Sequence, residues 1–156
     1  YDIIVASGAI HRGLKNVNWP GRLQVLRRNP YLVLDAAHNK ASARALKEAL
    51  GSYFDYDKLV LILGVSRDKD IKGICEELEP ASDMIILTRA NLPRAEEPAA
   101  LKDRIKKEAL FTKSVKEALT AADRIAGPND LILVTGSFFV LGEVLKARKE
   151  CELNLC

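Results

Sequence analysis

The 156-residue sequence predicts an α/β fold: a mostly parallel sheet with helices on both faces and an antiparallel hairpin strand near the N-terminus. Two observations support this prediction. Strand-type and helix-type segments alternate four times along the chain, which is typical of right-handed crossover units. The run at residues 59–65 is continuously apolar, as expected of a strand buried on both faces of a parallel sheet.

Residues 1–18 are interpreted as the tail of a preceding domain and a linker, because a short apolar run and a weak helical pattern are too little to form a core. Pro20 and Gly21 then suit a bend between domains, since proline fixes φ and glycine relaxes it. We therefore expect a domain boundary near Trp19, one domain over residues 19–150 and a C-terminal tail over residues 151–156.

The first half of the domain is predicted to contain a hairpin and two strand-to-helix units. Residues 23–26 and 31–34 form the hairpin, because a turn-type sequence separates them. The second strand leads into a helix over residues 42–50, with Gly51 as its stop. After the strand at residues 59–65, Asp70 is expected to cap the next helix.

The second half repeats this pattern. A strand at residues 84–88 is followed by an irregular loop and a helix over residues 99–107. Ser114 and Glu117 form a capping-box pattern at the start of a clearer helix. The last strand, at residues 131–134, precedes a helix that contains Phe138 and Phe139, which are expected to lie in the core.

Composition excludes several classes of partner. The net charge is +3, and 24 basic residues are interleaved with 21 acidic ones, so no polybasic stripe indicates nucleic acid. No apolar run approaches the roughly 18 residues needed to span a membrane. The three cysteines match no zinc-site spacing and fit a reducing, cytoplasmic setting.

Three predicted turns, at residues 35–39, 64–70 and 135–137, are expected to share one edge of the sheet. Each precedes a helix N-terminus, whose free N–H groups attract anions. The sequence contains no G-x-G-x-x-G after the first strand and no P-loop motif, so it supports neither dinucleotide binding nor a phosphate cradle from within this chain. The polar residues of this edge are Arg22, Asp35, His38, Asn39, Lys40, Asp68, Lys69, Asp70 and Ser137.

Each of these residues has a structural alternative. Asp35 could accept hydrogen bonds from ribose hydroxyls, or it could cap the next helix or pair with Arg22. Arg22 suits a phosphate but could be solvated, and His38 could contact an anionic substrate or be structural. Ser137 could meet a carboxylate or cap a helix, and residues 68–70 could be a solvated loop.

Four ordered motifs, at residues 19–22, 34–39, 64–70 and 135–137, resemble the C-terminal domain of the folylpolyglutamate synthase and dihydrofolate synthase family, a branch of the Mur ligases. The resemblance covers residues 17–149, and Lys40 replaces the proline usual in the second motif. It implies a Rossmann-like three-layer sandwich.

The resemblance also implies an ATP-dependent amide ligase that adds L-glutamate to folate through an acyl phosphate, with magnesium (Mg2+). The P-loop ATPase machinery, the metal ligands and the folate pocket are expected in an N-terminal domain, so this chain alone should be inactive. No catalytic residue or metal ligand is assigned to it. The implied roles are ATP binding for Arg22 and Asp35, glutamate binding for His38 and Ser137, and positioning for Asn39, Asp68 and Asp70.

Three alternatives remain open. The full protein could also have dihydrofolate synthase activity, it could instead be a Mur-type peptidoglycan amino-acid ligase, or the chain could be a non-catalytic α/β binding module. We expect a monomer. We also expect Arg22 to reach ATP only when the missing domain closes, so that residues 19–22 are displaced in this chain.

Overall fold

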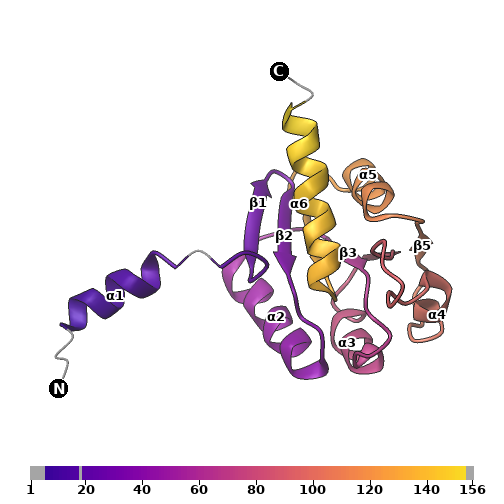
Figure 1. Ribbon diagram of the computed structural model, residues 1–156, viewed down its shortest axis with the longest axis horizontal. Coiled ribbons are helices and arrows are strands. Elements are labelled where there is room, and N and C mark those ends of the chain that lie inside the picture. Colours follow the sequence, from indigo (N-terminus) through magenta and orange to yellow (C-terminus); the bar gives the residue numbers. More distant parts are fainter. Residues whose placement is uncertain (1–5, 18, 154–156) are drawn as a thin grey trace.

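The computed structural model describes residues 6–17 and 19–153 (Figure 1). Its six-stranded sheet has the order β1-β2-β6-β3-β4-β5. The strands are β1 (Gln24–Arg28), β2 (Tyr31–Asp35), β3 (Leu59–Leu63), β4 (Met84–Leu87), β5 (Leu110–Phe111) and β6 (Leu131–Thr135). β1 runs antiparallel to β2, and the other neighbouring strands run parallel. The predicted sheet with its antiparallel hairpin strand is confirmed.

Helices cover both faces of this sheet. One face packs against α2 (Lys40–Tyr53) and α3 (Ile71–Leu78), and the other against α5 (Val115–Ile125) and α6 (Phe138–Leu153). Alternate residues of β3 divide between the two cores: Leu61 belongs to the first and Ile62 to the second. The three-layer arrangement is therefore as predicted.

The central strands end at one level, and this alignment brings the predicted turns together. Asp35 at the end of β2 is the register partner of Thr135 at the end of β6. Thr135 is in turn the partner of Leu63 at the end of β3. The carboxyl ends of β2, β6 and β3 thus form one continuous edge, as expected of adjacent parallel strands.

α2 is longer at both ends than the sequence predicted. Asn39 caps it, and the Asn39 and Ser42 side chains bond each other's backbone N–H groups, so the helix begins at Lys40. The predicted stop at Gly51 was wrong, because the helix continues to Tyr53. A glycine costs about 1 kcal/mol in a helix interior, so Gly51 weakens the helix without having to end it.

The predicted helix over residues 99–107 was too long. α4 (Pro98–Lys102) has five residues, and the bonds that follow it span three residues rather than four. The N–H groups of Lys106 and Lys107 donate instead to the Glu79 carboxylate, at 2.5 and 2.6 Å. A side chain from α3's C-terminus therefore satisfies the N–H groups that a longer helix would have bonded.

α1 (Ser7–Lys15) buries none of its residues and lies apart from the sheet in Figure 1. This position is compatible with the predicted boundary near Trp19, which remains a prediction. Within the described ranges, every helix is too short or too polar to cross a membrane. Half of the predicted C-terminal tail, residues 154–156, falls outside the described residues, and α6 extends to Leu153.

Candidate functional site

Residues 19–22 form an arm before β1, and Gly21 holds this arm against the domain. Gly21 is buried, its carbonyl accepts the Ala36 N–H at 2.9 Å, and its own N–H donates to the Gln24 side chain at 3.0 Å. A Cβ at Gly21 would lie 3.0 Å from Leu141 of α6. The expected displacement of residues 19–22 was therefore wrong for Gly21, because backbone bonds hold it beside β2.

Two exposed aromatic rings begin α6, and each faces an arginine. The guanidinium carbon of Arg22 lies 5.1 Å from the centroid of Phe138, and that of Arg94 lies 4.6 Å from the centroid of Phe139. Phe138 and Phe139 are 51% and 41% exposed, so the prediction that they belong to the core was wrong. The rings instead hold two cations beside the helix N-terminus through cation–π contacts.

Asp35 is a partly buried carboxylate at the end of β2. Its Oδ2 accepts the N–H of Leu23 at 2.8 Å, and Leu23 has a φ of +43°. Burial raises the pKa of Asp35, whereas the Leu23 N–H, the charge of Arg22 and the Ala37 N–H oppose that rise. No Arg22–Asp35 ion pair forms in the part of the chain that the structure describes.

These contacts test the alternatives for Asp35. It is not the cap of α2, because Asn39 takes that place. A carboxylate fixed by backbone N–H groups still has lone pairs that can accept hydrogen bonds from a ligand. Asp35 can therefore receive ribose hydroxyls without losing its bond to Leu23.

His38 is half-buried and oriented by two bonds to its own turn. Its backbone N–H donates to the Ser42 hydroxyl at 3.1 Å, and its ring Nδ1 lies 3.0 Å from the carbonyl oxygen of Ala36. Because a carbonyl only accepts, Nδ1 carries the proton of this contact. A neutral His38 then presents Nε2 as an acceptor, and a protonated one presents it as a donor.

Ser137 caps α6. Its hydroxyl accepts the Phe139 N–H at 3.2 Å, and its carbonyl accepts the Leu141 N–H at 3.2 Å. The preceding Gly136 has a φ of +103°, and a Cβ there would lie 2.6 Å from the carbonyl oxygen of Gly64. The capping alternative is realised, and the tight turn fixes the hydroxyl at the sheet edge.

The remaining predicted residues lie at the starts of α2 and α3. Asp70 caps α3 through the Gly73 N–H at 3.0 Å, and its other oxygen accepts the Lys40 N–H at 3.3 Å. Asp70 therefore ties the two helix starts together, through a bond that a proline at position 40 could not make. Asp68 is exposed and lies 2.8 Å from the Lys69 ammonium, which matches the solvated-loop alternative.

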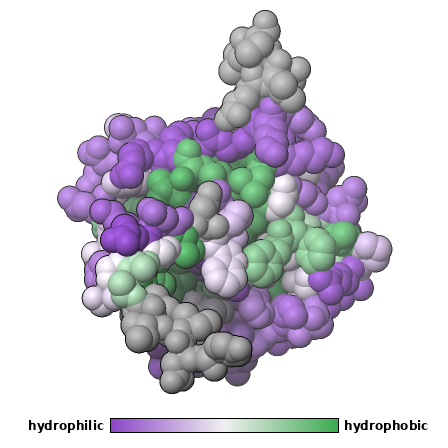
Figure 2. Space-filling model, turned by 60° about the vertical axis from the view of Figure 1, so that its left-hand side comes forward, coloured by the Kyte–Doolittle hydropathy of each residue, from purple (hydrophilic) through white to green (hydrophobic). Residues whose placement is uncertain are grey.

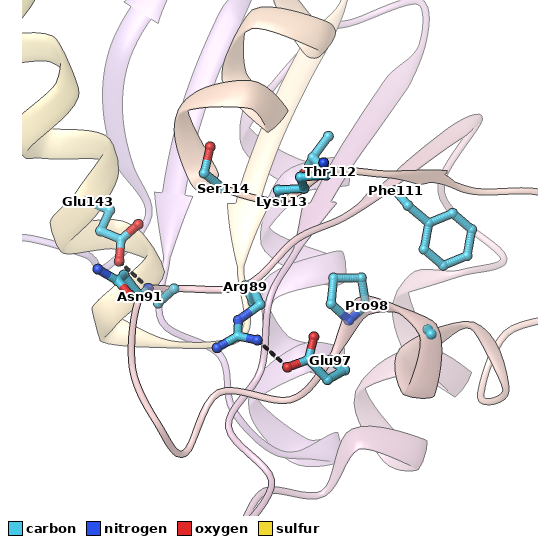
Figure 3. Close-up of a pocket in the computed structure, with 11 residues that line it drawn as sticks. Arg89, Asn91, Glu97, Pro98, Phe111, Thr112, Lys113, Ser114 and Glu143 are labelled. Atoms are coloured by element: carbon cyan, nitrogen blue, oxygen red, sulfur yellow. Dashed lines mark hydrogen bonds and ion pairs between the residues drawn. The ribbon is translucent and has the colours of Figure 1, made fainter.

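A cavity lies elsewhere on the same edge. It measures 640 Å³ and sits at the carboxyl ends of β4 and β5 (Figure 3). None of the seven predicted residues lines it. Sequence reasoning missed this cavity, because its lining comes from separate elements and no local pattern reports how they pack. No group of three or more potential metal ligands occurs among the residues that the structure describes.

Comparison with known proteins identifies the domain. The Mur ligase, glutamate ligase domain family matches residues 21–138. A "probable bifunctional folylpolyglutamate synthase/dihydropteroate synthase" of Haloferax volcanii is 38% identical, covering 86% of this chain and 16% of its own. The dihydrofolate synthase/folylpolyglutamate synthase of Mycobacterium tuberculosis is 34% identical, covering 86% and 31%. The UDP-N-acetylmuramyl-tripeptide synthetase of Lactobacillus acidophilus is 31% identical, covering 80% and 26%.

Solved structures show the same fold. The folylpolyglutamate synthase/dihydrofolate synthase of Yersinia pestis, complexed with AMPPNP and Mn ion, has a TM-score of 0.88 and 30% identity over 95% of this chain and 36% of its own. The E. coli FolC in complex with DHPP and ADP has a TM-score of 0.90 and 26% identity over 96% and 36%. A further structure of a bifunctional folylpolyglutamate synthase/dihydrofolate synthase, with Mn, AMPPNP and L-glutamate bound, has a TM-score of 0.88 and 30% identity over 95% of this chain and 36% of its own.

This chain spans about a third or less of the length of these relatives. The family match nevertheless extends over most of the domain. It begins at Gly21 and ends at Phe138, so it includes Arg22, Asp35, His38 and Ser137. The resemblance inferred from the four motifs is confirmed, and the chain belongs to the Mur ligase family as a glutamate ligase domain.

Proposed function

We propose that this chain is the C-terminal part of an ATP-dependent ligase that adds L-glutamate to folate through an acyl phosphate. One observation supports it most. Arg22, Ser137 and the pair Asp35 and His38 come from three separate motifs, yet all four lie at or beside the carboxyl ends of the adjacent strands β2 and β6. The names of the relatives support folate as the substrate, and many of them carry dihydrofolate synthase activity as well.

The nucleotide would meet two residues of this chain. Arg22, held over Phe138, is placed to contact phosphates, and Asp35 can accept the ribose hydroxyls. When bound, ATP would supply the phosphoryl group that activates the folate carboxylate. The chain contains no P-loop motif, and its described residues hold no metal cluster. We therefore assign the phosphate cradle and the Mg2+ ligands to an N-terminal P-loop domain of the same protein.

The incoming glutamate would meet His38 and Ser137. Because Nδ1 of His38 is committed to the Ala36 carbonyl, the Nε2 of a neutral imidazole can accept a hydrogen bond from the glutamate amine. Ser137 stands at the positive end of α6, where its hydroxyl can donate to a carboxylate. Asn39 and Asp70 fix the helix starts on either side of this turn, and we propose a positioning role for Asp68 on the neighbouring loop.

Apolar side chains beside this edge are exposed, as expected of a surface that a partner domain covers. Trp19 and Phe138 are 68% and 51% exposed. Figure 2 shows apolar residues gathered within a polar rim on the β1 side of the molecule. We propose that the N-terminal domain covers part of this surface. We further propose a monomeric, cytoplasmic enzyme with small-molecule substrates.

Two substitutions in the full-length enzyme test the site. Asp35→Ala should raise the KM for ATP about tenfold, the scale of a lost charged hydrogen bond. His38→Ala should mainly raise the KM for glutamate. Asp123→Ala, on the exposed surface of α5 and paired with Arg27, is the matched control and should change neither value. Loss of thermal stability in both site variants, with unchanged kinetics, would return Asp35 and His38 to structural roles.

The isolated 156-residue chain provides a separate test. Without the phosphate cradle and metal ligands it should show no glutamate-dependent ATP hydrolysis. Phosphate release would be measured with and without glutamate, and a glutamate-dependent rate from this chain would contradict the division of the site between two domains.

A second candidate is a Mur-type ligase that adds an amino acid to a muramyl substrate. The 31% identity to the UDP-N-acetylmuramyl-tripeptide synthetase favours it. The two candidates differ in the acceptor, so the full-length enzyme should be offered a folate and a UDP-muramyl peptide separately. Turnover with the muramyl peptide alone would replace the first candidate with the second.

A further inference from the structure

Thr135, the last residue of β6, carries a buried hydroxyl that has no hydrogen-bond partner among the described residues. The residue is 0% exposed, so the hydroxyl does not reach the surrounding solvent. Buried polar groups are nearly always hydrogen-bonded, because leaving one unpaired destabilises the fold. The hydroxyl of Thr135 therefore needs an acceptor close to the end of β6.

The register of the sheet places the Asp35 carboxylate beside this hydroxyl. Thr135 is paired with Asp35 of β2 on one side and with Leu63 of β3 on the other. Side chains alternate along a strand, and the residues two positions earlier, Val33 and Leu133, both lie in the core beside α2 and α3. Asp35 and Thr135 therefore project from the same face of adjacent strands, which lie about 5 Å apart. Of the two register partners, only Asp35 has a side chain that can accept a hydrogen bond.

The Asp35 carboxylate has room for this bond. Its Oδ2 accepts the Leu23 N–H at 2.8 Å, and a carboxylate offers about four acceptor positions on its two oxygens. Rotation about the Cα–Cβ bond moves the Thr135 hydroxyl between staggered positions. A hydroxyl that donates to a charged carboxylate forms one of the stronger hydrogen bonds in proteins. A change of rotamer at Thr135 would therefore satisfy its hydroxyl and the partly buried charge with one bond.

We propose that Thr135 is a positioning residue for Asp35: its hydroxyl donates a hydrogen bond to the carboxylate and fixes the orientation of the carboxylate at the sheet edge. Thr135 acts through Asp35 and does not itself touch a substrate, because it is fully buried. The effect of this bond on ATP binding rests on the proposed function, whereas the bond itself does not.

The pKa of Asp35 in the 156-residue chain tests the hydrogen bond directly. Burial raises this pKa, whereas the Leu23 N–H, the charge of Arg22 and the Ala37 N–H lower it. Thr135→Val keeps the shape of the side chain and removes the donor, so the pKa should rise by about one further unit. The ¹³C shift of the Asp35 carboxyl carbon would be followed through an acid titration. An unchanged pKa would overturn the proposal.

Three further variants separate the hydrogen bond from packing. Thr135→Ser retains the hydroxyl and should leave the pKa of Asp35 unchanged. Thr135→Ala should raise it as valine does, and it replaces Thr135→Val if that variant fails to fold. Thr88→Val is the matched control and should leave the pKa unchanged. The Thr88 hydroxyl is also buried and unpartnered among the described residues, but Thr88 follows β4, which β3 and β6 separate from β2. Equal effects of Thr88→Val and Thr135→Val would overturn the proposal.

Kinetics of the full-length enzyme test the consequence for the nucleotide. Thr135→Val should raise the KM for ATP about threefold, the scale of one hydrogen bond, and leave the KM for glutamate unchanged. Thr135→Ser should restore the KM for ATP. A raised pKa of Asp35 with an unchanged KM for ATP would support the hydrogen bond and overturn the ribose-binding role of Asp35 in the proposed function.

Discussion

The carboxyl group of Asp35 is held in an environment that favours its neutral form. Burial is the largest influence and raises its pKa above the ordinary value of 3.8. Folding therefore favours the protonated carboxyl. The stabilisation of the folded state that comes from this preference is complete below pH 3.8 and disappears as the pH rises through the pKa of Asp35 in the folded state. At neutral pH the ionised Asp35 is destabilising, which is common for groups kept for binding.

Asp35→Asn should therefore raise stability at pH 7 and reduce ATP use in the full-length enzyme. The amide oxygen can still accept the Leu23 N–H, and no charge is buried. We expect the melting temperature to rise by about 2 °C, measured by circular dichroism at pH 7 and again at pH 3, where the gain should disappear. Asp123→Asn, exposed on α5, is the control. A lower melting temperature at pH 7 would show that the charge is stabilising.

Gly136 and Gly142 offer a comparison of the same substitution in two environments. A Cβ at Gly136 would meet the Gly64 carbonyl at 2.6 Å in a backbone with positive φ, whereas one at Gly142 meets nothing within 4 Å. Gly136→Ala should cost about 2 kcal/mol or more, and Gly142→Ala should gain about 0.5–1 kcal/mol in the helix interior. Urea unfolding measures both. Similar effects from the two changes would contradict the tight turn at Ser137.

At the scale of elements, Glu77 joins α2 to α3. Its carboxylate lies 2.8 Å from the Arg44 guanidinium and 2.7 Å from the Lys47 ammonium, and only 7% of the residue is exposed. Its hydrogen bonds to Arg44 and Lys47 lower the pKa of Glu77 from 4.5 to about 2. The resulting stabilisation is complete above pH 4.5 and is lost as the pH falls toward 2.

Glu77→Gln should lower the melting temperature by several degrees at pH 7, because both cations lose their charged partner. The difference from the unmodified chain should shrink between pH 4.5 and 2, since protonation removes the same charge there. Glu48→Gln, exposed on α2, is the matched control and should show little change. A constant difference across this pH range would mean that packing, and not charge, accounts for the loss.

The elements that could be predicted are those whose pattern reports burial directly. The apolar runs of β3 and β6 and the capping pattern of Ser114 each predicted a correct element. β5 was missed because it has two residues, both exposed, and leaves no pattern in the sequence. The end of α4 depends on Glu79, far away in sequence, and no local signal reports such a contact.

At the scale of the whole molecule, the edge could be predicted from the sequence, whereas the cavity could not. Parallel strands must end together, so the meeting of Asp35, Ser137 and the residue 64–70 turn could be predicted from strand order alone. The exposure of Phe138 could not, because its position depends on where α6 starts relative to the arm at Gly21. The cavity could not either, since its lining comes from segments whose packing determines the hollow.

The exposure of α1 predicts that the folding unit begins after it. It buries no residue, and Ile10, Leu14 and Val17 leave 53%, 71% and 59% of their surface exposed. Removing residues 1–18 should therefore change the melting temperature by less than about 1 °C. It should also lower the binding of a hydrophobic dye, because an apolar stripe is removed with the helix.

A second truncation makes this test decisive. Starting the chain at Tyr31 also removes β1, together with the Gly21 carbonyl that accepts the Ala36 N–H and the Leu23 N–H that holds Asp35. This variant should melt well below the chain that starts at Trp19. If the first truncation were as damaging as the second, α1 would belong to the folding unit. The domain would then not begin near Trp19, and the arm that carries Arg22 would be internal to it rather than its first segment.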